Sequence, residues 1–294
     1  MGRAVLGLIQ ASHPVPAVAV TVFATAYAVA VQNGLIMDAF GPALPVGAAV
    51  FAGQLCVGWS NDALDADRDL AAQREEKPIS AGRVGAGTVA AAACLAAAAA
   101  VVLSTRLEDD AGLYHLIAVL GAVGYNAGLK STRLSPVPYL LSFGLVPVIA
   151  SLAVTGEWPA TSTVGAAALL GAGAHFANTV GDTEADALTG VRGLPQRIGP
   201  TRSLTVMAVL IALGAAWLLT GVAATDGIGF FRTILAVVLL VAGALLGLVG
   251  AVGRVGVPGG GRGRRRLGRP GGPVAFRLTL VAVALVVAGV LLTA

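Results

Sequence analysis

Nine apolar stretches, each long enough to cross a lipid bilayer as a helix, constrain the fold of this chain more than any other feature. A transmembrane helix needs about 20 predominantly apolar residues. The chain is 56% hydrophobic and 12% charged, whereas soluble domains are about 25% charged. The predicted spans are residues 14–32, 40–60, 84–104, 112–129, 138–155, 163–180, 203–222, 229–252 and 274–293.

These spans predict an all-α, polytopic membrane protein with about nine transmembrane helices around a central cavity. We expect residues 1–294 to form a single membrane domain. Abundant Ala and Gly predict a tight bundle, because small residues let helices approach closely. Cys56 and Cys94 fall in apolar stretches, and we interpret them as small core residues rather than as a disulfide or a metal site.

The distribution of basic residues predicts the orientation in the membrane. If the N-terminus is cytoplasmic, the segments facing the cytoplasm contain all of the 19 Lys and Arg except Arg106 and Arg232. This agrees with the positive-inside rule. Nine spans then put the C-terminus on the opposite side. We expect an integral protein of a bacterial cell membrane.

Residues 253–273 are predicted to form a flexible basic loop on the cytoplasmic side. Most of its arginines, from Arg262 to Arg269, lie among Gly and Pro residues. We interpret them as determinants of topology that also contact anionic lipids. No nucleic-acid partner is expected, because neither a folded platform nor interleaved aromatic residues accompany them.

Two clusters of Asn and Asp residues stand near the ends of the second and sixth spans, both on the predicted cytoplasmic side. On a helix, a spacing of four residues stacks side chains on one face. Carboxylates packed this closely repel one another and need a counter-charge, for which a divalent cation is suited. The residues with this spacing are Asn61, Asp65 and Asp69 in the first cluster, and Asn178, Asp182 and Asp186 in the second.

The positions of the clusters also predict an internal repeat. Four spans separate them, so two four-helix halves would have the same orientation, with a ninth helix added. Two helix ends rich in oxygen ligands would then face each other across the central cavity.

The ligand types in the clusters predict magnesium chemistry. Magnesium binds oxygen ligands, commonly a few carboxylates plus substrate phosphates. Two such clusters fit two metal ions that bridge a diphosphate and neutralise it as a leaving group. The predicted ligands are Asn61, Asp65, Asp182 and Asp186, with Asp62 and Asp69 flanking the first set.

Basic residues near the same membrane face are the predicted diphosphate contacts. Lys77 and Lys130 are the only lysines in the chain, and an ammonium group serves as a point charge on phosphate. Arg68, Arg74 and Arg197 are further candidates, with the positive-inside bias as the alternative explanation. An apolar cavity would hold a hydrocarbon tail and keep water from a carbocation. The residues thus predict metal-assisted ionisation of a lipid diphosphate and capture of the resulting cation.

Five segments together resemble the motifs of the UbiA superfamily of intramembrane prenyltransferases, in the order of that family and over nearly the whole chain. Asn61 to Asp69 is similar to its N-D-x-x-D-x-x-x-D motif, and Asp182 to Asp186 to its second aspartate motif. Lys77 to Gly82 resembles R-P-L-x-x-G, with Lys in place of Arg. Tyr125 to Lys130 resembles Y-x-x-x-L-K, and Gly193 to Gly199 resembles L-P-x-R-x-G.

The resemblance implies a helical bundle whose cavity opens to lipid, and Mg²⁺-dependent transfer of an isoprenoid chain from its diphosphate to an acceptor. The same four residues, Asn61, Asp65, Asp182 and Asp186, would be the catalytic metal–diphosphate ligands. The resemblance also implies diphosphate contacts by Lys77, Lys130 and Arg197. The expected partners are a prenyl diphosphate, a small acceptor and membrane lipids.

Four residues are weaker candidates for the acceptor pocket. His13 precedes Pro14 where many family members carry Arg or Lys, which disfavours a carboxylate acceptor such as 4-hydroxybenzoate. His175 and Asn178 lie seven and four residues before Asp182, on the same expected helical face. Tyr125 completes the set. Simple packing is the alternative for Tyr125 and His175.

We predict an aromatic or quinone-precursor acceptor. Alternatives within the family are transfer to a sugar phosphate, as in decaprenylphosphoryl-ribose synthesis, and terpene cyclisation without an acceptor. Arg74, Arg133 and Arg192 could serve a second phosphate. An ion or metal transporter is disfavoured, because both clusters lie at one membrane face whereas transport sites usually lie near the midplane.

Overall fold

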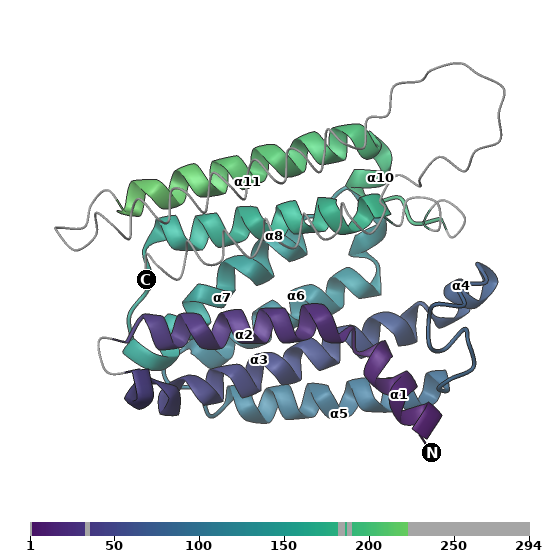
Figure 1. Ribbon diagram of the computed structural model, residues 1–294, viewed down its shortest axis with the longest axis horizontal. Coiled ribbons are helices and arrows are strands. Elements are labelled where there is room, and N and C mark those ends of the chain that lie inside the picture. The colour runs from purple at the N-terminus through teal and green to yellow at the C-terminus, as the bar shows by residue number, and fades with distance from the viewer. Residues whose placement is uncertain (1, 33–35, 182–185, 187–189, 223–294) are drawn as a thin grey trace.

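The computed structural model describes residues 2–32, 36–181, 186 and 190–222 of the chain. Within these ranges every regular element is a helix and there is no strand, which confirms the all-α class. The long helices lie side by side in a bundle (Figure 1). They are α2 (Pro14–Ala30), α3 (Ile36–Leu64), α5 (Ala86–Ser104), α6 (Ala111–Ala127), α7 (Val137–Thr155), α8 (Thr161–Gly181) and α11 (Pro200–Val222).

Each long helix overlaps one of the first seven predicted spans. In the part of the chain that the structure describes, α3, α5, α7 and α11 are long and apolar enough to cross a membrane. Counting α2 and the helix before it as one broken span gives a fifth. The helix α6 is apolar but has 17 residues. His175 and Asn178 lower the mean hydropathy of α8. The predicted spans 229–252 and 274–293 and the basic loop 253–273 lie outside the described residues.

The sequence prediction missed α1 (Gly2–Ala11), because ten residues are too short to register as a span. This helix meets α2 at 57°. The chain bends at His13, whose φ of 51° lies in the left-handed region. Proline disfavours a helical conformation in the residue before it, and Pro14 follows directly. The indole nitrogen of Trp59 in α3 donates a 2.9 Å hydrogen bond to the carbonyl of Leu8, which anchors α1 to the bundle.

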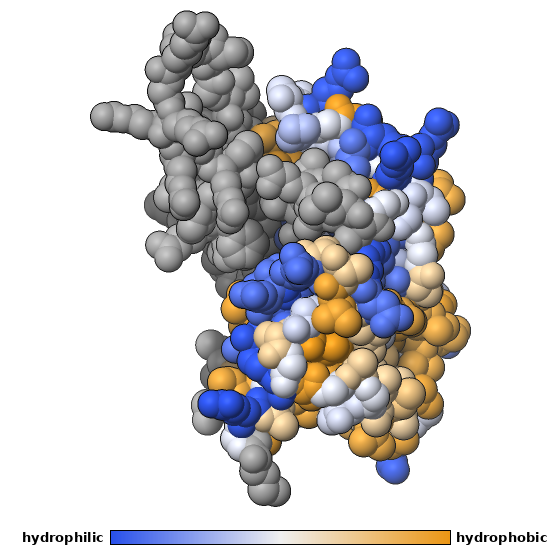
Figure 2. All heavy atoms as spheres, turned by 90° about the vertical axis from the view of Figure 1, so that its right-hand side faces the viewer, coloured by the Kyte–Doolittle hydropathy of each residue, from blue (hydrophilic) through white to orange (hydrophobic). Residues whose placement is uncertain are grey.

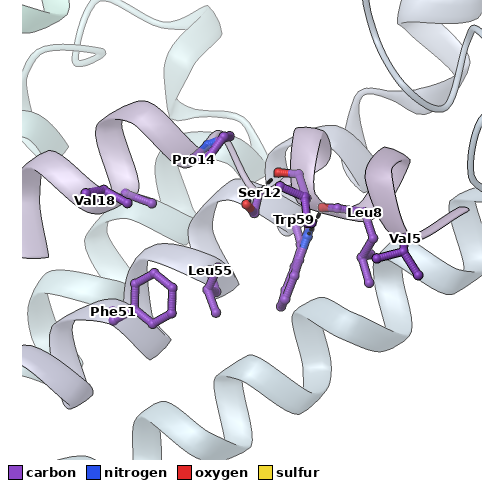
Figure 3. A pocket seen from close by; sticks show the side chains of 10 residues that line it. Val5, Leu8, Ser12, Pro14, Val18, Phe51, Leu55 and Trp59 are labelled. Carbon is purple, nitrogen blue, oxygen red and sulfur yellow. Dashed lines mark hydrogen bonds between the residues drawn. The ribbon is translucent and has the colours of Figure 1, made fainter. Parts of the chain in front are cut away.

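An apolar pocket of about 300 Å³ lies where α1, α2 and α3 meet (Figure 3). Val5, Leu8 and Ile9 of α1 line one side, and Phe51 and Leu55 of α3 line another. The hydroxyl of Ser12 and the indole nitrogen of Trp59, which also line the pocket, donate to backbone carbonyls of α1. These two donors are therefore satisfied within the protein, and the lining suits hydrocarbon.

The outside of the bundle is apolar, as expected of an integral membrane protein. Leu95 on α5 is 73% exposed and Leu120 on α6 is 69% exposed. Such side chains would be costly in water but face hydrocarbon in a bilayer. Inside the bundle, Gly165 and Gly171 of α8 leave room for the rings of Trp217 and Phe143, so small residues do permit close helix packing.

The short elements gather at one end of the bundle, on the right of Figure 1. They are α4 (Ala66–Ala71), the 3₁₀ helix η1 (Leu129–Ser131) and α10 (Leu194–Ile198). Because the long helices alternate in direction, α3, α6 and α8 all end here. Figure 2 views this end and shows hydrophilic residues gathered on it. The fold thus brings the predicted polar segments to a single end.

Candidate active site

The first Asn/Asp cluster spans the junction between α3 and α4. Helix α3 ends at Leu64 and α4 begins at Ala66, with Asp65 between them. Helical backbone hydrogen bonds continue across this junction. Asp65 N donates to Asn61 O at 3.0 Å, and Asp69 N donates to Asp65 O at 2.8 Å. The Asn61 Nδ2 lies 3.5 Å from Asp65 Oδ2, so these two predicted metal ligands are neighbours.

Asp65 is held by two basic side chains. The Lys130 Nζ lies 2.5 Å from Asp65 Oδ1 and 2.6 Å from Oδ2, and Arg68 forms an ion pair with Oδ1. Lys130 belongs to η1, directly after the turn at Gly128 that ends α6. Burial lowers the pKa of Lys130, and the hydrogen bond to Asp65 opposes that shift. Lys130 is therefore a buried amine whose hydrogen bonds to Asp65 favour its charged form against the effect of burial.

Asp62 forms a second charged group with residues from two distant segments. It is 2% exposed, and its Oδ1 accepts from Lys77 Nζ at 2.7 Å. The Nε2 of His13 lies 2.9 Å from the same oxygen. The fold thus places Lys77 at the first cluster, and its contact with a diphosphate stays a prediction. It places His13 there too, beside a carboxylate and an ammonium group.

Asp69 has its own basic partner. The Arg74 Nη1 lies 3.4 Å from Asp69 Oδ1, and Arg74 Nε lies 2.8 Å from Glu76 Oε1. Asp69 is buried, and burial raises its pKa. The hydrogen bond from Arg74 lowers the pKa of the exposed Glu76. Asp62, Asp65 and Asp69 therefore each have a basic neighbour.

Asn126 is a site residue that the sequence reasoning missed. It is 5% exposed, and its Oδ1 accepts from Asn61 Nδ2 at 3.2 Å. Its own Nδ2 donates to the carbonyl of Val57 and to Ser60 Oγ. These bonds fix the orientation of the Asn61 amide. A polar residue directly after Tyr125 in an apolar span was the signal available.

The second cluster is only partly described. Asp182 lies outside the described residues, whereas the Asp186 carboxylate accepts a 2.7 Å hydrogen bond from Gln196 Nε2 of α10. The carbonyl of Asp186 accepts from Val191 N at 3.0 Å. Arg197 is exposed and its Nε donates to the carbonyl of Arg192. Its predicted diphosphate contact stays a prediction.

Three rings from α6, α7 and α8 pack against one another. Tyr125 of α6 and Tyr139 of α7 have ring centroids 5.2 Å apart. His175 of α8 lies 5.6 Å from the ring of Tyr125 and 5.0 Å from that of Tyr139. His175 is 1% exposed, whereas Asn178 is exposed. The four predicted acceptor residues therefore lie in different environments. His175 is buried, Asn178 is exposed, Tyr125 packs in the ring cluster, and His13 contacts Asp62.

The donor types fit a magnesium ion. Among the described residues, no group of three or more His, Cys, Asp and Glu side chains is placed to hold a metal. The amide of Asn61 and the carboxylates of Asp65 and Asp186 nevertheless offer oxygen ligands, which Mg²⁺ prefers. Asp182, the fourth predicted ligand, lies outside the described ranges. Both clusters thus contain oxygen ligands of the type that Mg²⁺ prefers.

Comparisons with known proteins agree with these features. A family model, that of the UbiA prenyltransferase family, matches residues 14–252. No curated protein gives a match. Several solved structures share the fold over nearly their full lengths.

A UbiA homologue from Archaeoglobus fulgidus bound to GPP and Mg²⁺ has a TM-score of 0.69 at 16% identity, covering 96% of this chain and 98% of that chain. An apo UbiA homologue from Aeropyrum pernix K1 has a TM-score of 0.68 at 20% identity, covering 92% and 96%. A structure described as digeranylgeranylglyceryl phosphate synthase has a TM-score of 0.65 at 16% identity, covering 99% and 98%.

Proposed function

The chain belongs to the UbiA prenyltransferase family, and from this premise we propose that it transfers a prenyl or polyprenyl group from its diphosphate to a small acceptor inside the membrane. The observation that carries the proposal is the buried contact between Lys130 and Asp65. It joins the Y-x-x-x-L-K segment to the first aspartate motif. A cation and carboxylates held together in this way are suited to a metal–diphosphate group.

We assign the metal to residues of both clusters. Asn61, Asp65, Asp182 and Asp186 would hold Mg²⁺, with Asp62 and Asp69 supporting the first site. When bound, Mg²⁺ would neutralise charge on the leaving diphosphate. The homologue that contains GPP and Mg²⁺ supports the choice of metal.

The basic residues would bind the remaining diphosphate oxygens. Lys130 and Lys77 have ammonium groups held at Asp65 and Asp62, so each donor is fixed at the first cluster before substrate arrives. Arg68 pairs with Asp65 and would contribute a third cation. Fixed donors stabilise developing charge without reorganisation. Arg197 is the fourth proposed contact.

The proposal includes the full membrane topology. Residues 1–294 would form one domain of nine transmembrane helices in two four-helix halves plus one. The N-terminus and both clusters would be cytoplasmic. The alternating helices and the shared end of α3 and α8 support this arrangement.

For the acceptor we propose an aromatic or quinone-precursor ring. The neighbouring rings of Tyr125 and Tyr139 support this choice, because both are partly exposed and aromatic side chains stack favourably on a planar ring. His13 contacts Asp62 and Lys77, so it is poorly placed to bind a carboxylate of the acceptor.

A phosphate-bearing acceptor is the second candidate. Arg133 and Arg192 are exposed and belong to the segments at the polar end, where they could contact a soluble sugar phosphate. The structural relative described as digeranylgeranylglyceryl phosphate synthase supports such an acceptor. A terpene cyclase would use the same ionisation chemistry and release a product without an acceptor.

One experiment separates these functions. Membranes containing the full chain are incubated with labelled prenyl diphosphates, Mg²⁺ and a panel of acceptors, and the products are identified by mass. We expect Asp65→Ala to abolish Mg²⁺-dependent diphosphate release, whereas Asp67→Ala should release it normally, because Asp67 is exposed. Normal release by Asp65→Ala would refute the proposal.

A further inference from the structure

A buried serine connects the Lys130 turn to the segment that follows the second cluster. Ser135 is fully buried and lies five residues after Lys130. Its Oγ accepts a 3.0 Å hydrogen bond from the backbone N–H of Leu194, the first residue of α10. The same oxygen lies 3.0 Å from His175 Nε2 in α8. One hydroxyl therefore joins three segments that are distant in the sequence.

The imidazole of His175 contacts Ser135 through one ring nitrogen. The hydroxyl oxygen of Ser135 accepts from Leu194 N–H, and its own hydrogen and second lone pair allow it either to donate to His175 Nε2 or to accept from it. The other ring nitrogen, Nδ1, is buried and has no hydrogen-bond partner among the described residues. Only the Nε2 side of His175 therefore contributes to this connection.

A glycine permits the close approach of the two segments. A Cβ atom on Gly193 would lie 2.5 Å from the carbonyl oxygen of Lys130 and 2.9 Å from Ser135 Oγ. Such distances are too short for a side chain beside backbone. Gly193 therefore lets the start of α10 lie directly against the turn that carries Lys130.

The other end of this connection reaches the second cluster. In α10, Gln196 Nε2 donates to Asp186 Oδ2 at 2.7 Å. Two residues earlier in the same helix, Leu194 is bound to Ser135. A five-residue helix thus spans from the Lys130 turn to Asp186, and Lys130 in turn contacts Asp65 of the first cluster.

We propose that Ser135 and His175 are positioning residues that set the place of Lys130 and the first cluster relative to Asp186. The side-chain hydrogen bonds of Ser135 go to His175 and to Leu194, so both residues act through α10 and the Lys130 turn. The proposal rests on the assignment of Asp65 and Asp186 to one metal–diphosphate site. Residues that orient metal ligands typically change metal affinity about 10–100-fold when replaced.

The test compares two substitutions of the same histidine. The amide of His175→Gln can reach the place of Nε2 and keep the bond to Ser135, whereas the shorter His175→Asn cannot. Both remove the ring from the aromatic cluster, so the loss of packing is matched. Ser135→Ala removes the hydroxyl itself. Mg²⁺ affinity is measured by calorimetry on the full chain in lipid nanodiscs, with a non-hydrolysable prenyl diphosphate analogue present.

We expect His175→Asn and Ser135→Ala to weaken Mg²⁺ binding about tenfold, and His175→Gln to stay close to the wild type. Unchanged affinity in the first two variants, or equal losses in His175→Gln and His175→Asn, would overturn the proposal. A fall in melting temperature that parallels the loss of affinity would also overturn it, since the role would then be structural only. Failure of the wild type to bind the analogue with Mg²⁺ would instead refute the proposed function.

Discussion

Replacing Lys130 should separate binding of the prenyl diphosphate from binding of the acceptor. The change Lys130→Met removes the ammonium group and keeps a similar unbranched stem. Hydrogen bonds to charged groups contribute about 1.5–3 kcal/mol. Since about 1.4 kcal/mol is a factor of ten, we expect the KM for the prenyl diphosphate to rise roughly 10–100-fold. The KM for the acceptor should change little.

The assay is steady-state kinetics in membranes, with each substrate varied in turn. Arg133→Met is the matched control, because Arg133 is a basic residue three positions along and is exposed. It should leave the KM for the diphosphate near the wild-type value. Equal increases in both KM values for Lys130→Met would contradict a role on the diphosphate.

A stability measurement checks the same contact independently. Lys130 and Asp65 side chains are 8% and 12% exposed, and removing one partner of a buried pair costs about 3–5 kcal/mol. Arg68 also pairs with Asp65, so we expect a loss of about 2 kcal/mol, within the range for one charged hydrogen bond. Adding Asp65→Asn should restore part of this loss, because it removes the buried carboxylate that lost Lys130, while Arg68 is partly exposed to solvent. A purely additive double variant would show that the pair is uncoupled.

Two further predictions concern buried polar residues of the site. Asn126→Leu removes the acceptor of the hydrogen bond from Asn61 Nδ2. It should lower Mg²⁺ affinity about tenfold, as for other residues that orient metal ligands. An unchanged Mg²⁺ affinity in calorimetry would exclude this role. Burial raises the pKa of Asp69, so this carboxyl binds its proton more tightly in the folded than in the unfolded chain. The charged carboxylate therefore lowers the stability of the fold as the pH rises above about 4. The change Asp69→Asn should therefore raise the melting temperature at pH 7, and a pH series in which this gain grows on acidification would contradict the argument.

The sequence determined the helices well because the length of an apolar stretch is a local property. Each described long helix lies within four residues of a predicted span at both ends. Helix α1 was missed, since its ten residues fall below the length of a span. Its direction depends on the bend at His13 and on the contact between Trp59 and Leu8. Neither feature can be recognised from hydropathy.

The same local reasoning placed both aspartate clusters and both lysines at one end of the bundle. Counting spans was sufficient for this, because each crossing reverses the direction of the chain. The particular partners were decided only by the tertiary structure. Lys77 pairs with Asp62, and Lys130 pairs with Asp65. Those pairings depend on how α3 is rotated and on how the loops fold back.

Ser135 and Tyr139 carried no signal in the sequence. Serine is common in loops and helix ends, and one tyrosine in an apolar helix does not stand out without its neighbours. The packing of the helices brings Ser135 into contact with His175 of α8 and Leu194 of α10. Sequence alone therefore determined which chemical groups reach the polar end of the bundle. The tertiary structure decided which of them touch, because contacts between distant segments depend on helix rotation and packing.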